Sequence, residues 1–216
     1  MSEFPIVDVL TRLRAALIGM PQPLIDQMQQ AGAFKVLIAT LLSLRTRDET
    51  TAQVTPRLFA RASTPAAMRE LPESELAQLI YPVGFYRNKA RDILRICTIL
   101  CEQYAGDVPR TQAELRALPG VGLKTANLVL AVGHGIPAIC VDVHVHRICN
   151  RWGYLDTATP EATEAELTAL VPVAYWIHIN ELLVTLGQQI CTPTSPRCTQ
   201  CPISDVCARR GITRHR

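Results

Sequence analysis

The 216-residue sequence contains no apolar run long enough to cross a membrane as a helix. Its first residues, MSEFPIVDVLTRLR, also lack the basic segment and apolar core of a secretory signal. We therefore expect no membrane association and, in the absence of a transit segment, a bacterial cytoplasmic location. The eight cysteines would then lie in a reducing compartment, where metal binding is more common than disulfide formation.

The sequence also lacks a strong net charge and any convincing β-strand pattern. Its formal charge is only +3, so a nucleic-acid binding surface would have to be local. Apolar residues make up 48% and charged residues 19%, which is typical of a globular protein with a substantial core. Because apolar residues recur at helical spacing and no stretch is a convincing strand with period-two alternation, we predict an all-α fold.

Prolines, glycines and polar residues divide the chain into helices. Thr64-Pro65, Leu71-Pro72 and Thr159-Pro160 carry the proline that is typical of a helix start. Gly106 is expected to end a long helix. The predicted segments are Ile6 to Ile18, Phe34 to Leu44, a helix opened by Asp48, two short helices, Arg87 to Tyr104, Pro160 to Val171, and Tyr175 to Cys191.

A glycine-rich turn, LPGVG at residues 118–122, separates two further helical patterns. Thr111 and Glu114 have the spacing of a capping box, which opens a helix before the turn. After the turn, Ala126, Val129 and Leu130 recur at the spacing of one helix face, continued at position 133. The sequence therefore predicts two helices joined by a tight hairpin.

Gly120, Val121 and Gly122 in this hairpin are candidate DNA-binding residues. Glycine permits positive φ and close approach of the backbone, and amides at the start of the next helix attract anions. The turn has no side chain suited to reading a base, so it would bind a backbone phosphate without sequence preference. An ordinary helix–helix turn would show the same four residues, Pro-Gly-Val-Gly.

Lys124 and Asp142 are the candidate catalytic residues. Lys124 lies in the first turn after the hairpin, where the helix dipole disfavours a cation and so favours a nucleophilic amine. Asp142 is expected to be the N-cap of a helix that runs to about Trp152, where the dipole keeps its carboxylate ionised. Alternatively, Lys124 only touches phosphate and Asp142 is only a cap.

His144 and Arg147 follow Asp142 and share a helix face at i,i+3 spacing. They are candidates for contact with the DNA backbone or for support of Asp142. His144 and His146 at i,i+2 point apart on a helix, which argues against a metal site.

A second motif lies near the C-terminus, where Cys191, Cys198, Cys201 and Cys207 give the spacing C-x6-C-x2-C-x5-C. Four thiolates in one short loop need a metal to neutralise them. From the residues alone, zinc and an iron–sulfur cluster are both possible. The other four cysteines lie in apolar surroundings and are expected to be small buried hydrophobic residues.

The stretches LPGVGLKTANLVLA and VDVHVHRICNR together resemble the helix-hairpin-helix motif and catalytic aspartate loop of the endonuclease III family of DNA glycosylases. LLSLRTRD, VGFYRNKA and the cysteine loop extend the resemblance from about Phe34 to Cys207. The resemblance implies that Lys124 and Asp142 carry the reaction and that the four cysteines hold a [4Fe–4S] cluster. It also implies a nucleoid-associated monomer that acts on double-stranded DNA containing a damaged base or an abasic site.

The same resemblance assigns Arg45 and Phe85 to the space left when a nucleotide is extruded from the duplex. The family commonly has glutamine where this chain has Arg45, which affects the expected preference for the opposite base. Phe85 can stack like a base. Another departure is Leu123, where a basic residue often precedes the catalytic lysine.

By resemblance, the fold has two helical domains with a cleft between them. One is a six-helix domain at residues 24–135 with the helix-hairpin-helix. The other combines residues 1–23 and 136–216 and carries the cluster loop. The implied activity is that of a bifunctional DNA N-glycosylase and abasic-site β-lyase, with oxidised or ring-saturated pyrimidines as substrates.

Two alternatives remain from the sequence. A monofunctional mismatch glycosylase of the same superfamily would use the aspartate with water and usually lacks the hairpin lysine. A non-catalytic DNA-binding iron–sulfur protein would need neither Lys124 nor Asp142.

Overall fold

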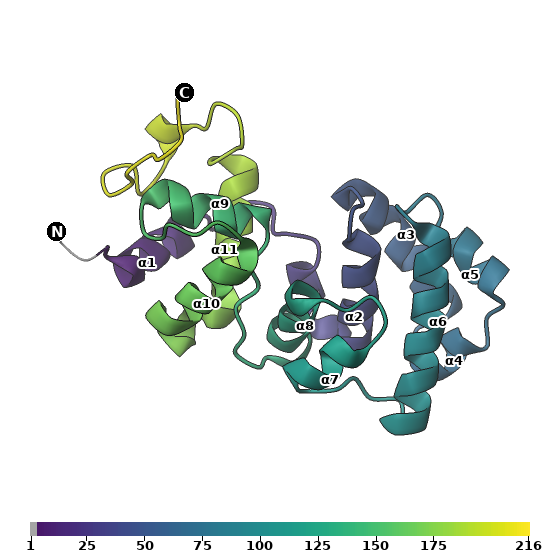
Figure 1. Cartoon of the computed structure of the whole chain (residues 1–216). Helices are drawn as coiled ribbons and strands as arrows, with labels where there is room; N and C mark the ends of the chain where they lie inside the picture. Colours follow the sequence, from purple (N-terminus) through teal and green to yellow (C-terminus); the bar gives the residue numbers. More distant parts are fainter. Residues whose placement is uncertain (1–3) are drawn as a thin grey trace. The chain divides into compact units, whose positions relative to one another are not determined.

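The computed structural model describes residues 4–216, and every regular element in that range is helical, which confirms the predicted all-α class. The chain divides into two compact units, Leu24–Ile136 and the combination of Met1–Pro23 with Pro137–Arg216. Figure 1 shows the helices that make up each unit. Between residues 4 and 216, no helix is both long enough and apolar enough to span a bilayer.

The unit Leu24–Ile136 is built around α2, Ala33–Ser43, whose residues from Val36 to Leu42 are all buried. A helix that is apolar on every side needs neighbours on every side. Those neighbours come from both sides of α2 in the chain, namely η1 (Asp26–Ala31) before it and α3 (Asp48–Arg61), α6 (Tyr86–Gln103), α8 (Leu123–Leu128) and the π-helical turn η2 (Val129–Gly133) after it. The unit also contains α4 (Pro65–Arg69), α5 (Glu73–Ile80) and α7 (Gln112–Ala117) (Figure 1).

The helix boundaries in this unit follow local chemistry. The Thr64 hydroxyl accepts a hydrogen bond from Ala67 N before Pro65 opens α4, and the Thr111 hydroxyl accepts one from Glu114 N at the start of α7. These contacts satisfy amides that have no partner within the helix. Pro56 lies inside α3 rather than near its start.

The hairpin helix differs from the predicted single apolar face. After α8 the chain widens into the π-helical η2, and every residue from Thr125 to Val132 is buried. Gly133 packs so closely on α2 that an added Cβ would lie 2.9 Å from Ala33 Cα. The segment is therefore enclosed on all sides, and the residues between the predicted face positions are as buried as the face itself.

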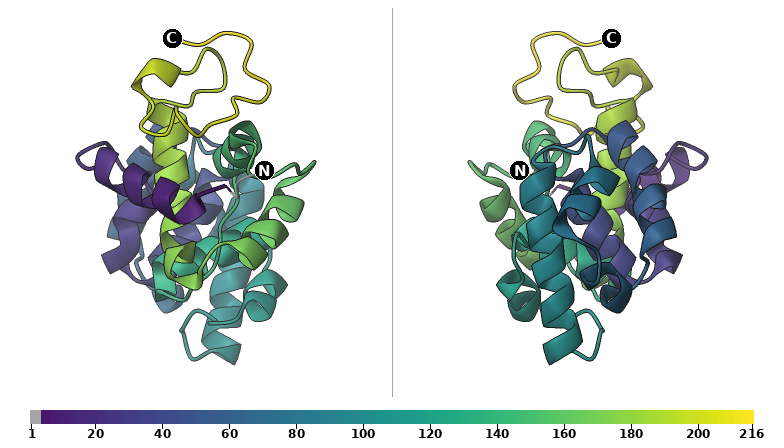
Figure 2. Two further views of the ribbon diagram at one scale, coloured as in Figure 1. Left: turned by 90° about the vertical axis from the view of Figure 1, so that its left-hand side faces the viewer. Right: turned by 90° about the vertical axis from the view of Figure 1, so that its right-hand side faces the viewer.

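The second unit contains α1 (Ile6–Ala16), α9 (Val143–Trp152), α10 (Pro160–Leu170), η3 (Val173–Tyr175), α11 (Trp176–Gln189) and η4 (Cys198–Gln200). Its core includes Leu10, Leu13, Trp152 and Leu186. Both views in Figure 2 show α1 lying across α11, and the C-terminal loop lying beyond the end of α11. This arrangement places the cysteine loop beside α1 and the end of α9.

Candidate active site and cysteine loop

The hairpin presents backbone rather than side chains. Gly120 has φ +71°, a conformation that L-residues rarely adopt. Gly122 is the N-cap of α8 and supplies no side chain to cap it, so the first amides of α8 are left for an external acceptor. The side chain of Val121 is buried, with 7% exposed, so only its backbone could contact a phosphate. The local geometry of the three predicted residues is thus suited to an anion.

Lys124 is the second residue of α8 and its side chain is exposed. The preceding turn fixes where α8 begins, and that start places Lys124 in the first helical turn. The amine is therefore accessible to a reactant from solvent.

Asp142 is the N-cap of α9, as predicted. Its Oδ1 accepts hydrogen bonds from His144 N at 2.8 Å and from Val145 N at 3.0 Å. Both cap bonds use one carboxylate oxygen, so the cap does not occupy Oδ2. The carboxylate is half-buried, and its orientation is fixed by its own helix.

Arg147 makes its contacts within the protein. Its guanidinium donates to Cys191 O at 2.9 Å, to Gly187 O at 3.4 Å and to His144 Nδ1 at 3.1 Å. Because arginine is always the donor, Nδ1 of His144 is the acceptor and Nε2 carries the proton in the neutral ring. Burial lowers the pKa of Arg147 from its ordinary value. These bonds join α9 to the end of α11, and contact of Arg147 or His144 with DNA stays a prediction.

Arg45 and Phe85 lie together. The Arg45 guanidinium carbon is 5.6 Å from the centre of the Phe85 ring, and both residues have a left-handed backbone, with φ 53° and 58°. Phe85 is 59% exposed, so its ring is not part of the core. The structure thus brings the two predicted gap-filling residues into one exposed stacked pair.

The four C-terminal cysteines line a single cavity, together with Trp152, Ile190 and Ile212. Burial raises the pKa of Cys201 to about 11, so this thiol stays protonated at neutral pH unless a metal replaces the proton. Among residues 4–216, no group of three or more His, Cys, Asp or Glu side chains is arranged to hold one metal ion. Four sulfur ligands that line one cavity are the ligand set of an iron–sulfur cluster and also of a structural zinc ion.

Comparison with known proteins agrees with this geometry. A family model described as "HhH-GPD superfamily base excision DNA repair protein" matches residues 38–173. A second model, described as "Iron-sulfur binding domain of endonuclease III", matches residues 191–207. Endonuclease III of Thermotoga maritima is 46% identical over 186 residues, which cover 85% of this chain and 87% of that protein. The chain belongs to the endonuclease III family.

Two further relatives extend the match over nearly the whole chain. Endonuclease III of Escherichia coli K12 is 38% identical and covers 96% of both proteins. A solved structure described as a trapped endonuclease III–DNA covalent intermediate superposes with a TM-score of 0.86 at 35% identity and covers 97% of both chains. The protein is accordingly a base excision DNA repair enzyme, a DNA glycosylase and abasic-site lyase, with DNA as partner and a [4Fe–4S] cluster as cofactor.

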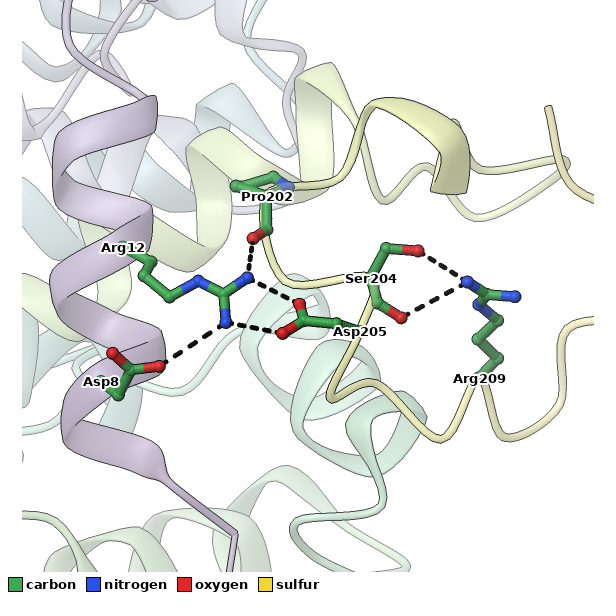
Figure 3. A network of polar contacts seen from close by, with 6 residues as sticks. All are labelled: Asp8, Arg12, Pro202, Ser204, Asp205 and Arg209. Atoms are coloured by element: carbon green, nitrogen blue, oxygen red, sulfur yellow. Dashed lines mark hydrogen bonds and ion pairs between the residues drawn. The ribbon is translucent and has the colours of Figure 1, made fainter.

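Three arginines form hydrogen bonds within or to the cysteine loop. Arg151 donates to Thr192 O at 2.8 Å, to Pro193 O at 2.6 Å and to Cys191 Sγ at 3.5 Å. Arg12 on α1 pairs with Asp8 and Asp205 and donates to Pro202 O, while Arg209 donates to Ser204 (Figure 3). No sequence pattern links Arg12 to position 205, because the contact depends on the fold.

Lys89 lies in the segment VGFYRNKA at the start of α6, and its side chain is half-buried. Its ammonium donates to Leu42 O at 2.9 Å, to Leu44 O at 2.6 Å and to Thr46 Oγ1 at 3.3 Å. Burial lowers the pKa of Lys89 to about 8. In the sequence, only the position of Lys89 within the family motif VGFYRNKA indicates that it could have a role.

Proposed function

We propose that Lys124 is the nucleophile and Asp142 the proton acceptor of a bifunctional reaction on oxidised or ring-saturated pyrimidines. The observations that support the proposal are an exposed amine on the first turn of α8 and, at the start of α9, a carboxylate whose Oδ2 is not used by its cap. Backbone amides around Gly120 and Gly122 would bind a phosphate of the same DNA strand.

The covalent steps use these two side chains. Lys124 Nζ bonds to C1′ of the extruded nucleotide as the bond from C1′ to the base breaks. The base leaves with the electron pair and takes up a proton, while Asp142 accepts a proton from the attacking amine. Opening of the sugar gives an iminium, which acidifies the C2′ proton. Loss of that proton expels the 3′ phosphate and cleaves the strand.

Cys191, Cys198, Cys201 and Cys207 are the proposed ligands of the cluster. When bound, the cluster would cross-link the C-terminal loop, and the reaction above requires no electron transfer from it. Family membership and the cavity that all four residues line support this assignment.

The remaining parts of the proposal concern the setting. Arg45, Phe85, His144 and Arg147 would contact the DNA, and the protein would act as a monomer on the nucleoid of a bacterial cell. Relatives from Thermotoga maritima and Escherichia coli, which match 85% and 96% of this chain, support the bacterial part of this setting.

Borohydride trapping tests the mechanism. Wild-type protein and Lys124→Ala are mixed separately with a duplex containing thymine glycol and with one containing an abasic site, and reductant is added. The proposal predicts an adduct of wild-type protein with both duplexes and none with Lys124→Ala. An adduct with the abasic duplex alone would keep the lyase but refute the substrate class.

The absence of any adduct from folded, DNA-binding protein would refute the Schiff-base mechanism. Release of a mismatched base without strand cleavage would then identify the monofunctional alternative. Failure to release any base would identify the non-catalytic one.

A further inference from the structure

Two loops of the unit Leu24–Ile136 hold the stacked pair of Arg45 and Phe85. One joins α2 to α3 and the other joins α5 to α6. Left-handed backbone costs a non-glycine residue roughly 1–2 kcal/mol, so two such residues side by side require a structure that holds them. Phe85 is the N-cap of α6, and its carbonyl accepts a hydrogen bond from Lys89 N at 3.0 Å, but this bond does not link the two loops.

The two loops touch directly at Gly84 and Thr46. The Gly84 N–H donates to Thr46 Oγ1 at 3.1 Å. A Cβ added to Gly84 would lie 2.6 Å from Arg45 O, so only glycine permits this approach. The backbone of the Phe85 loop therefore lies against the backbone of the Arg45 loop.

Lys89 links both loops through its ammonium group. The residue lies in the first turn of α6, directly after Phe85, and its three acceptors surround Arg45: Leu42 O and Leu44 O before it, and Thr46 Oγ1 after it. An ammonium has three donors, so these three oxygens use all of them. Two of the acceptors are at the C-terminal end of α2, where the helix dipole favours a cation.

The three hydrogen bonds thus hold the Lys89 ammonium in one place between the two loops. The side chain is half-buried, and its lowered pKa has burial as its cause. The amine is fully engaged by the loop, so Lys89 does not contact a reactant.

We propose that Lys89 is a positioning residue for nucleotide extrusion, which holds the Arg45 loop and the Phe85 loop together so that both side chains enter the duplex as one unit. This inference rests on the proposed function, in which Arg45 and Phe85 contact DNA. In this role, Lys89 orders both loops before DNA binds. Preorganisation of this kind raises affinity by lowering the entropy lost on binding.

The test compares two duplexes, one containing a stable tetrahydrofuran abasic analogue and one undamaged, with the full-length holoprotein. The analogue presents the gap that Arg45 and Phe85 would fill, and neither duplex requires catalysis by Lys124. The measured quantity is the ratio of the two dissociation constants. A 2-aminopurine opposite the analogue reports by fluorescence whether the pair enters the stack.

Lys89→Met is expected to lower the preference for the gapped duplex by about tenfold, which corresponds to the loss of one charged hydrogen-bond network. Thr46→Val removes one acceptor and the Gly84 contact, and it should lower the ratio in the same direction. Lys35→Met is the matched control, because it removes the same charge from the same unit at a site where the amine lies 5.7 Å from the Phe59 ring. It should leave the ratio unchanged.

A double-mutant cycle separates positioning from general stability. Phe85→Ala should lower the ratio by itself, and adding Lys89→Met should lower it further by less than it does in the wild type, because only Arg45 is then left to position. A ratio unchanged in Lys89→Met, an equal loss of binding to both duplexes, or an undiminished effect of Lys89→Met in Phe85→Ala would overturn the proposal. If Lys89→Met does not fold, Thr46→Val carries the same test.

The outcome is distinguishable from failure of the proposed function. Wild-type protein that forms no borohydride adduct would refute the chemistry and leave the binding ratios informative. Wild-type protein that traps normally, with ratios that Lys89→Met does not change, would refute the positioning role alone.

Discussion

Asp142 combines a structural and a chemical role in one carboxylate. Oδ1 accepts both cap bonds of α9, and the proposed proton transfer uses the charge of the group. Asparagine keeps an oxygen that can cap the helix but carries no charge. The two roles can therefore be separated by substitution.

Asp142→Asn is expected to lower the rate of base release by about 10²- to 10⁴-fold, the usual contribution of a positioned base. Its melting temperature should stay close to that of the wild type. Asp142→Ala should lose the activity and also about 1 kcal/mol of unfolding free energy, because the cap is lost. Single-turnover base release and thermal melting measure the two effects. A fully active Asp142→Asn protein would contradict the catalytic assignment.

Lys89 predicts a stability change with pH. Its folded pKa of about 8 lies below the value of an unfolded lysine, about 10.4, so between these values the unfolded chain binds more protons than the folded one. The penalty for burying the ammonium is therefore complete below pH 8 and is relieved as the pH rises to about 10.4.

The measurement is the difference in unfolding free energy between the wild type and Lys89→Met, by denaturant titration from pH 7 to pH 10.5. The difference should move in favour of the wild type as the pH rises. Lys35→Met serves as the control for general alkaline effects. A difference that moves the other way would show that the hydrogen bonds to the ammonium outweigh the cost of its burial.

The sequence predicts the role of a residue when that role depends on neighbours within a few positions in the chain. Gly120, Lys124 and Asp142 are visible because a turn, a first helical turn and an N-cap are each specified within a few residues. Lys89 is not visible in this way, because its role depends on oxygens more than 40 residues away in the chain. The stacking of Arg45 on Phe85 is non-local for the same reason.

At the scale of elements, caps and prolines predict several helix starts, including those of α4, α9 and α10. The π-helical η2 was not predicted, because a continuous apolar run gives no indication of which turn will widen. The contact of α9 with α11 is also non-local. An added Cβ on Gly187 would collide with the imidazole of His144, so this helix pair requires glycine at that position.

Gly187→Ala should therefore destabilise the protein by about 1–3 kcal/mol, the usual cost of overpacking. The His144 ring would have to move, and its bond from Arg147 would be lost with it. Denaturant unfolding measures the change. Gly211→Ala is a control for the loss of a glycine, since no atom lies within 4 Å of its added Cβ, although its φ of +69° adds some strain. Equal stability of Gly187→Ala and wild type would contradict the observed packing.

The contact between α1 and the cluster loop yields another prediction. Arg12 pairs with Asp205 at 2.6 Å and also donates to Pro202 O (Figure 3). Arg12→Met should release this part of the loop and speed the loss of the cluster to an iron chelator, followed by its visible absorbance. Arg14→Met, an exposed position on the same helix, should lose the cluster at the wild-type rate. Equal rates for all three proteins would exclude Arg12 as a support of the loop.

At the scale of the whole molecule, the low net charge limits how the enzyme finds DNA. A [4Fe–4S]²⁺ core with four thiolates adds a formal charge of −2, which takes the chain from +3 to +1. Long-range attraction is then weak, and affinity depends on individual residues. The division of the chain into two units depends on contacts between residues far apart in the chain. The sequence therefore indicates the two units only through its resemblance to the family.

The central claim is that Lys124 is the nucleophile, and the small number of lysines allows a direct test. The chain has only three, Lys35, Lys89 and Lys124. Wild-type protein trapped with borohydride on an abasic duplex would be digested, and the modified peptide identified by mass spectrometry. The account predicts modification at Lys124. Modification at Lys89, Lys35 or the N-terminal amine would contradict it.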